Sequence, residues 1–440
     1  MPSPGKPQPS ASALKASPAA SFSQRLLWVG ALFLGAIALF LIASQARNIP
    51  APALAPAATP VNLLQPTFQL EQAAVTSASL SSASDANTWL MEAGNPARSR
   101  QSPATLQLPL QEQGFLGTIS ATGDNGSPPI IVGNIMLIET DKELRAIDRS
   151  TGQQRWAFVE RGSYISPAIF GSLALIRVEA DNKGELIAID LQNGTKRWIF
   201  TPRRISSAST NFYGGHIGSP LIVDGIAYVS AGGEVYALDA VTGALRWTFA
   251  TQELVTSSLA AAQGSLYISD FRYIYAIDQQ KGSLLWAKEN ETTFSFAPVV
   301  SGEYVIIARG TQLVALDRST GQQRWAFSPK DEALTPAGAD GTLAYAKSTN
   351  TLYAIDLASG VKRWQYHNAE FVSLPSISSQ HMFLVEGMGA NTILTALDSA
   401  SGTAVWQLAY GKLARSGPIV VNNSLYTRME DGRVLAFRSP

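Results

Sequence analysis

The sequence predicts an all-β protein, an eight-bladed β-propeller with N-terminal strand closure, preceded by one transmembrane helix and a disordered linker. One motif recurs seven times, and each copy offers four short strands. An eighth unit after the last copy offers three strands and lacks the outer strand, which an unpaired upstream segment can supply. The expected segments in chain order are a cytoplasmic tail (1–25), a transmembrane helix (26–43), an Ala/Pro/Ser-rich linker (44–86), a lead-in segment (87–114) and the propeller (115–440).

Composition narrows the classes of function. The 440 residues carry 33 basic and 33 acidic side chains, so no excess of positive charge is available to bind nucleic acid. No cysteine is present, which excludes disulfides, thiolate metal sites, cysteine nucleophiles and a lipid anchor on an N-terminal cysteine. An apolar content of 46% is ample for a large core that is stable without disulfides.

The stretch from Leu26 to Ala43 predicts the membrane helix because it contains no charged residue. A helix of this length spans about 27 Å. Basic residues lie mainly before it, so we expect a single-pass cell-membrane protein with its N-terminus in the cytoplasm and the propeller outside. The alternative is a signal peptide with Ser44 and Ala46 before the cut, which would release a secreted protein. Residues 44–86 are expected to be a flexible tether.

The repeated motif is Ala, then Ile or Leu, then Asp, with Gly four residues after the Asp and Trp eight residues after it. Successive Asp positions are 39 to 49 residues apart, which is the length of one propeller blade. The Asp–Gly–Trp trios are Asp148, Gly152 and Trp156; Asp190, Gly194 and Trp198; Asp239, Gly243 and Trp247; Asp278, Gly282 and Trp286; Asp317, Gly321 and Trp325; Asp356, Gly360 and Trp364; and Asp398, Gly402 and Trp406.

Each trio predicts a β-hairpin. The apolar residues before the Asp suit a strand, the Asp side chain can accept N–H groups of the following turn, and the Gly permits the positive φ that reverses the chain. The returning strand carries the Trp, which we expect to cover the seam between neighbouring blades and to donate its N–H to a backbone carbonyl. The Ala two positions before the Asp is expected to leave room for the Trp ring.

Two further strands precede each hairpin. The first usually starts with a small residue and proline, as at Ser219 and Pro220, and a short turn leads to the second, such as Ile226–Ser230. After Trp406 the chain offers three strands but no fourth. The upstream segment Phe115–Ser120 is expected to pair as the outer strand of the last blade, which closes the ring without an open edge.

The pattern Ala-x-Asp-x-x-Thr/Ser-Gly-x-x-x-Trp resembles the repeat of pyrroloquinoline-quinone-like (PQQ-like) propellers over residues 115–440, and Trp89–Arg98 resembles their lead-in. That family includes quinone-dependent alcohol and glucose dehydrogenases. It also includes non-enzymatic members, such as the scaffold lipoprotein of the outer-membrane β-barrel assembly machine, which is anchored through a cysteine. The repeat residues build blades in both kinds and do not choose between them.

Resemblance to the enzymes implies PQQ, a calcium site of Glu and Asn, a catalytic Asp and often a vicinal cysteine pair. The inner-strand segments Ser166–Phe170, Ser219–Val223 and Pro298–Val300 contain no acidic residue, so the oxygen ligands that calcium needs cannot be assigned there. The three histidines show no metal-ligand spacing. We therefore assign no catalytic or metal-binding residue and keep PQQ with calcium as the alternative.

A candidate partner-binding loop is the longest insertion, between residues 201 and 218, which carries Arg203, Arg204, Tyr213 and His216. The insertions fall in links that share one face of a propeller, as expected where loops on a rigid scaffold carry the function. This loop is either a polar and aromatic contact patch for a partner or an ordinary solvated loop made flexible by two glycines.

Three functions stay open on the sequence alone. The favoured one is a membrane-anchored extracytoplasmic binding or scaffold module for protein partners, with no chemistry of its own. The alternatives are a PQQ-dependent dehydrogenase or cofactor-binding relative, and a sensor that binds a sugar or cell-wall ligand in the axial funnel. The sequence does not name the partner.

Overall fold

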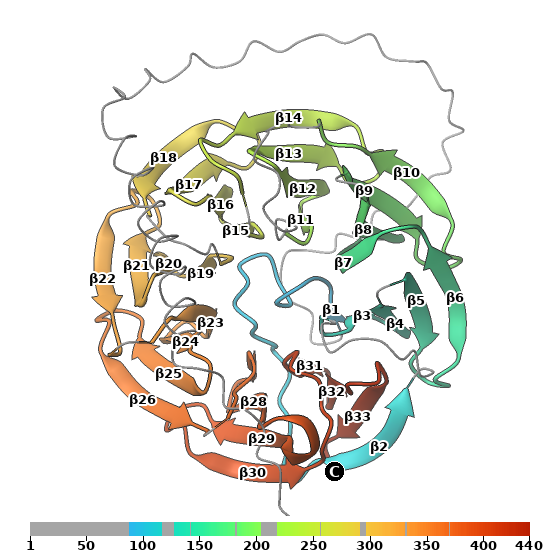
Figure 1. The fold of residues 1–440 in the computed structure, drawn as a ribbon, viewed down its shortest axis with the longest axis vertical. Helices are drawn as coiled ribbons and strands as arrows, with labels where there is room; N and C mark the ends of the chain where they lie inside the picture. Colours follow the sequence, from blue (N-terminus) through green and yellow to red (C-terminus); the bar gives the residue numbers. More distant parts are fainter. Residues whose placement is uncertain are drawn as a thin grey trace, which may run out of the picture. The chain divides into compact units, whose positions relative to one another are not determined.

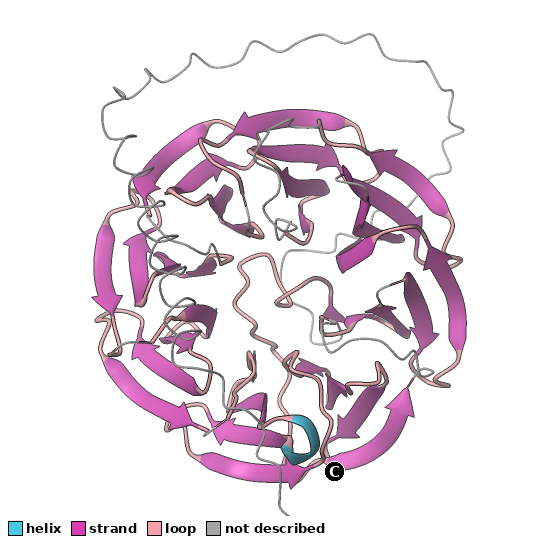
Figure 2. Ribbon diagram, in the orientation of Figure 1, coloured by secondary structure: helices cyan, strands magenta, loops and turns pink. Residues whose placement is uncertain are grey.

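The described part of the chain is a ring of β-sheets. The computed structural model describes residues 88–116, 127–140, 142–180, 183–203, 218–255, 257–290, 296–330, 332–368 and 370–440. These residues form eight sheets around a central axis (Figure 1), and one short 3-10 helix, η2 (Gly389–Asn391), interrupts the strands (Figure 2). The predicted membrane helix (26–43) and linker (44–86) lie outside these ranges. Within them, no helix has the length and apolar character needed to cross a membrane.

Each sheet is one antiparallel blade, in which the strands follow one another from the axis to the rim. The first four blades comprise, in chain order, β3 (Ile130–Val132), β4 (Ile135–Glu139), β5 (Glu143–Asp148) and β6 (Gln154–Val159); β7 (Ser163–Phe170), β8 (Leu173–Ala180), β9 (Lys183–Asp190) and β10 (Lys196–Phe200); β11 (Leu221–Val223), β12 (Ile226–Ala231), β13 (Glu234–Asp239) and β14 (Leu245–Ala250); and β15 (Ala260–Ala262), β16 (Ser265–Ser269), β17 (Tyr273–Asp278) and β18 (Leu284–Glu289).

The remaining blades repeat this order, and two strands from the lead-in join the first and last blades. Blades 5 to 8 comprise β19 (Val299–Ser301), β20 (Tyr304–Arg309), β21 (Gln312–Asp317) and β22 (Gln323–Phe327); β23 (Thr335–Ala339), β24 (Leu343–Lys347), β25 (Thr351–Asp356) and β26 (Lys362–His367); β27 (Ser376–Ile377), β28 (His381–Glu386), β29 (Ile393–Asp398) and β30 (Ala404–Ala409); and β31 (Ile419–Val421), β32 (Ser424–Arg428) and β33 (Val434–Arg438). The lead-in strands are β1 (Thr88–Trp89) and β2 (Gln111–Leu116).

The predicted closure of the ring is confirmed. Strand β2 pairs antiparallel with β33 and is the outer strand of blade 8. It begins at Gln111, earlier than the predicted Phe115–Ser120, and the residues after Leu116 lie outside the described ranges. An outer strand has one face in water, so the polar run at its start fits this position. The Arg433 guanidinium lies 3.9 Å from the centre of the Phe115 ring and covers the new edge.

The tryptophans occupy the seams between blades, as predicted, but the predicted bond from Nε1–H to a carbonyl does not form for Trp198 and Trp247, whose Nε1 atoms are buried without a hydrogen-bond partner among the described residues. Each tryptophan lies opposite the Ala two positions before the Asp, as Trp156 does opposite Ala146. Four of them donate Nε1–H to a carbonyl of the next blade at 2.8–3.1 Å: Trp156 to Leu191, Trp286 to Arg318, Trp325 to Leu357 and Trp364 to Ser399. These bonds and rings tie neighbouring blades together along the rim.

The motif glycines have a second role that the sequence did not reveal. A Cβ placed on any of six of them would lie 2.5–2.7 Å from the Trp ring of the preceding blade, closer than carbon atoms can approach. These glycines are Gly194, Gly243, Gly282, Gly321, Gly360 and Gly402. The motif therefore encodes both a turn with positive φ and a flat surface for the neighbouring indole.

The motif aspartates cap the turns, as predicted. Asp317 Oδ1, for example, accepts the N–H groups of Ser319 and Thr320 at 3.0 and 2.9 Å. Its other oxygen accepts a hydrogen bond from Arg324, seven residues on, and these bonds lower the pKa of Asp317 to about 2. Five blades have this Asp–Arg pair, whereas Leu285 and Val405 replace the arginine in blades 4 and 7.

Candidate functional site

The ring has two faces, which differ in the chain connections that they carry. Consecutive strands of a blade are antiparallel, so their connections alternate between the faces. Turns from first to second strands and from third to fourth strands form one face, which we call the turn face. Links from second to third strands and links between blades form the other, the loop face. The insertions that the sequence analysis identified belong to the loop face.

The lead-in chain passes through the centre of the ring (Figure 1). Strand β1 is antiparallel to β3, so the chain enters from the turn face as an additional innermost strand of blade 1. Residues 90–102, which we call the axial segment, then accept backbone N–H groups from the first-strand regions of five other blades at 2.8–3.0 Å. The donors and acceptors are Ile169 to Leu90, Ala261 to Pro96, Val300 to Ala97, Ala339 to Ser99 and Ile377 to Arg100.

A glycine permits this close approach of the axial segment to blade 6. A Cβ on Gly338 would lie 2.5 Å from the carbonyl oxygen of Ser99, and the φ of Gly338 is +129°. Any larger residue would push the axial segment away from β23 and break the bond between Ala339 and Ser99. The centre of the propeller is therefore built to receive a chain along its inner edges.

An ion pair between the buried Arg98 and the partly exposed Glu92 fixes the axial segment toward the loop face. Arg98, which is 3% exposed, donates to Glu92 at 3.0 Å, to Ser219 Oγ at 3.1 Å and to the carbonyl of Leu259. Glu92 also accepts hydrogen bonds from Ser219 at 2.5 Å and Ser258 at 3.1 Å. Desolvation at the axis raises the pKa of Glu92. The charge of Arg98 and the hydrogen bonds from Arg98, Ser219 and Ser258 outweigh that effect and leave the pKa below its usual value.

Arg100 is a second buried cation in the axial segment. It donates Nε–H to the carbonyl of Pro375 in blade 7 at 2.6 Å, and burial lowers its pKa to about 10. Arg98 and Arg100 both have positive φ values, +55° and +57°, which cost about 1 kcal/mol or more each for residues with a Cβ. The hydrogen bonds of the two guanidinium groups offset this strain.

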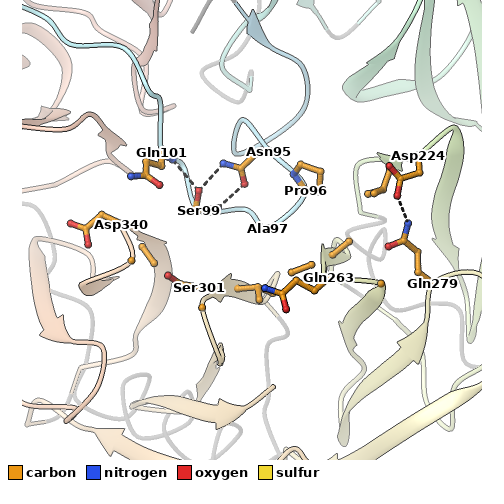
Figure 3. A pocket seen from close by; sticks show the side chains of 18 residues that line it. Asn95, Pro96, Ala97, Ser99, Gln101, Asp224, Gln263, Gln279, Ser301 and Asp340 are labelled. Carbon is orange, nitrogen blue, oxygen red and sulfur yellow. Dashed lines mark hydrogen bonds between the residues drawn. The ribbon is translucent and has the colours of Figure 1, made fainter. Parts of the chain in front are cut away.

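A pocket of about 530 Å³ opens on the turn face beside the axial segment. Asn95, Ser99 and Gln101 of the axial segment line one side, and the turns after the first strands of blades 3 to 6 line the other (Figure 3). Asn95 is held by hydrogen bonds with Ser99 at 2.7 and 3.2 Å. The turns contribute two carboxylates, Asp224 and Asp340, together with Gln263, Gln279 and Ser301. Among these described lining residues, none is basic or aromatic.

The candidate loop of the sequence analysis begins and ends at informative positions. The backbone N–H of Arg203 donates to the Tyr236 hydroxyl at 3.3 Å, and the loop leads to Ser219, which binds Glu92 at the axis. Arg204, Tyr213 and His216 lie outside the described residues. The structure thus places the start and the end of this loop but does not test the predicted contact patch.

The axial segment and the pocket were not predicted as a site. Trp89–Arg98 resembles a lead-in, but its path through the ring could not be predicted because its contacts with the inner strands use backbone carbonyls, which no side-chain pattern reports. A signal that could have pointed to this path is Gly338, a glycine inside the first strand of blade 6, β23. The pocket joins short turns from four blades, and each turn alone looks like an ordinary solvated connection.

Comparison with known proteins identifies the family. The family model described as "Outer membrane protein assembly factor BamB" matches residues 112–207, 182–328 and 270–439. The chain belongs to this family. The matches cover the propeller and begin at the closing strand β2, so the PQQ-like repeat expected from the Asp–Gly–Trp motif is confirmed. No curated protein matches the chain.

Solved structures confirm the fold of this BamB-family propeller. BamB from Moraxella catarrhalis is 19% identical, with a TM-score of 0.56 over 75% of this chain and 100% of that chain. A europium-containing methanol dehydrogenase is 14% identical, with a TM-score of 0.59 over 80% and 89%. Quinohemoprotein alcohol dehydrogenase from Comamonas testosteroni is 13% identical, with a TM-score of 0.55 over 80% and 82%. At these identities the likeness shows the fold alone.

The residues around the axis do not fit PQQ with calcium. Glu92 is the carboxylate of the axial segment, and its Oε2 already binds Arg98, Ser219 and Ser258. The first strands offer mainly apolar or small residues, such as Leu221 and Val299. In the described residues no group of three His, Cys, Asp or Glu side chains could hold a metal ion. We therefore assign no residue of this chain to PQQ chemistry.

Proposed function

We propose that this BamB-family chain is an extracytoplasmic scaffold, tethered to the membrane by residues 26–43, that binds protein partners through its propeller and performs no chemistry. Membership of the family supports a protein-binding module. The zero net charge gives no reason to expect nucleic acid as the natural partner. The uncharged stretch 26–43, with basic residues before it, supports the anchor and the orientation.

The axial segment is the observation that carries this proposal. Its five backbone bonds, together with the Arg98–Glu92 pair, occupy the inner edges of the blades around the centre of the ring. A rigid ring with a filled centre presents its pocket and its two faces, and rigid faces with varied loops are suited to binding other proteins.

Capture of partners tests the binding function. The full chain with a C-terminal affinity tag is cross-linked in its native membranes, purified and analysed by mass spectrometry. We expect a reproducible set of proteins that is absent from a control chain lacking residues 88–440. Absence of such a set would contradict the proposal. Saturable tryptophan quenching by PQQ and calcium, with dye-linked oxidation of alcohols or sugars, would replace it with the dehydrogenase.

A reporter fusion tests the location. β-Lactamase fused after Pro440 should confer ampicillin resistance only if the propeller is outside the cytoplasm. Deleting residues 26–43 should abolish the resistance. Recovery of residues 1–25 and the propeller in one membrane-bound chain supports the anchor, whereas a mature protein beginning near residue 47 shows the cleaved signal peptide instead.

A further inference from the structure

We propose that the turn-face pocket is the site for an extended, lysine- or arginine-bearing segment of a partner protein. This inference rests on the proposed binding function and names the chemistry of the partner. The pocket follows the turns of four consecutive blades, from Asp224 in blade 3 to Asp340 in blade 6, around the outside of the axial segment (Figure 3).

The shape of the pocket suits a single chain in an extended conformation. Its inner wall is the axial segment, and its base consists of small residues such as Pro96, Ala97, Ala261 and Ala339. Pro96, Ala97 and Ser99 already use their carbonyls to bind the blades. The inner wall is therefore fixed before a ligand arrives, and a preformed groove loses less conformational entropy when a ligand binds.

The charge of the pocket favours a cationic ligand. Asp224 and Asp340 are the charged side chains that line the pocket, both come from turns, and hydrogen bonds within its turn fix the position of Asp340. Asp340 accepts the N–H groups of Thr342 and Leu343 at 2.8 and 2.7 Å and the Tyr345 hydroxyl at 2.6 Å. With two carboxylates and no basic lining residue, the pocket attracts lysine or arginine side chains and repels acidic segments.

Asp224 is the more accessible of the two carboxylates. It is exposed, adopts a φ of +50° and accepts one long hydrogen bond from Gln279 at 3.4 Å. The exposed amides of Gln101 and Gln263 can bind the backbone of a peptide between the two aspartates. A sugar is the less suitable occupant, because the described lining offers no aromatic ring on which a sugar could stack.

Peptide titration of the full chain in detergent tests the site. The probe is a fluorescein-labelled decapeptide of alternating Gly and Lys, compared with a Gly/Glu decapeptide and with the trimer of N-acetylglucosamine. We expect binding of the lysine peptide alone, weakened by added salt. Asp224→Asn and Asp340→Asn should each lower its affinity about three- to tenfold. Unchanged urea midpoints show that the variants are folded.

Glu303→Gln is the matched control. Glu303 is an exposed carboxylate on the same face, next to the pocket residue Gly302 and paired with Arg318 at 3.2 Å, but it does not line the pocket. Its loss should change the affinity less than twofold, because it removes the same charge from outside the groove. An equal effect of Glu303→Gln and Asp224→Asn would reduce the site to a diffuse charge and overturn the proposal.

Two further outcomes would refute the pocket as the binding site for a cationic segment and would leave the proposed protein-binding function unaffected. Binding of the glutamate peptide, or of the sugar trimer in place of the lysine peptide, would overturn the assignment of the occupant. Repeating the partner capture with a chain carrying both Asp224→Asn and Asp340→Asn separates the two proposals. Capture by the wild type and equal capture by this double variant would leave the scaffold standing and the pocket refuted, whereas reduced capture supports both.

Discussion

Replacement of Gly282 by alanine tests whether the glycine–tryptophan contact holds adjacent blades together. A Cβ at this position would lie 2.5 Å from Cδ2 and 2.6 Å from Cε3 of Trp247 in the preceding blade. These atoms belong to the fused part of the ring, and the ring also packs against Tyr228 with centroids 5.8 Å apart. The clash cannot be relieved by a small rotation of a flexible side chain, so the two blades must separate.

The expected loss of stability has two parts, and Gly264 separates them. Gly282 has a φ of +69°, so alanine there carries a backbone penalty of about 1–2 kcal/mol. Overpacking against the indole adds about 1–3 kcal/mol. Gly264, in the same blade, has a φ of +79° and nothing within 4 Å of its Cβ position, so alanine there carries the backbone penalty alone. We expect a total loss of about 2–5 kcal/mol for Gly282→Ala.

Urea denaturation of each variant, followed by circular dichroism and tryptophan fluorescence, measures both losses. The midpoint should fall further for Gly282→Ala than for Gly264→Ala, with equal slopes if the compactness of the folded state is kept. Equal losses in the two variants would refute the packing role and leave the motif glycine as a turn residue only.

Three further predictions concern the axis, the turns and the closing strand. Arg98→Met should lower the free energy of unfolding by about 1–2 kcal/mol, because it removes the hydrogen bonds of Arg98 to Leu259 and Ser219 and the ion pair with the partly exposed Glu92, and adding Glu92→Gln should restore part of that loss in a urea cycle. The pKa of Asp317 is lower in the folded state, so the stability that Asp317→Asn removes at pH 5 should shrink as the pH falls from about 4 to about 2, as urea midpoints will report. Deleting residues 88–116 should abolish cooperative unfolding, because β33 and five inner strand regions lose their partners.

Much of the fold could be predicted because every copy of the repeat has the same residues at the same spacing. Asp, Gly and Trp at fixed spacing determine a hairpin, and seven copies followed by a unit of three strands determine the number of blades and the need for closure. The start of the closing strand was predicted too late, at Phe115, whereas β2 begins at Gln111 within the predicted lead-in segment. A polar strand at the rim lacks the alternation of apolar and polar residues from which a strand is predicted.

The candidate site could not be predicted in the same way, because its contacts join parts of the chain that share no pattern. Arg98 binds the carbonyl of Leu259, which is 161 residues away, and Arg100 binds that of Pro375, 275 residues away. Sequence periodicity reports local burial, whereas these bonds depend on where the ring brings the inner strands. The two arginines are informative only once their burial at the axis is known.

The N-terminal stretch closes the ring at two places, and this has a consequence for folding. Residues 88–102 bind the inner edges of the blades, and residues 111–116 complete the outer edge of blade 8. The bonds of residues 88–90 join blades 1 and 2 and can form early, whereas the bonds to blades 4 to 7 and the pairing of β2 with β33 cannot form until most of the chain is available. Contacts of such large sequence separation slow folding but make unfolding cooperative. Residue 88, where the proposed tether would join the domain, belongs to the innermost strand β1. A force applied through the tether would therefore act first on the contacts at the axis and only then on those at the rim.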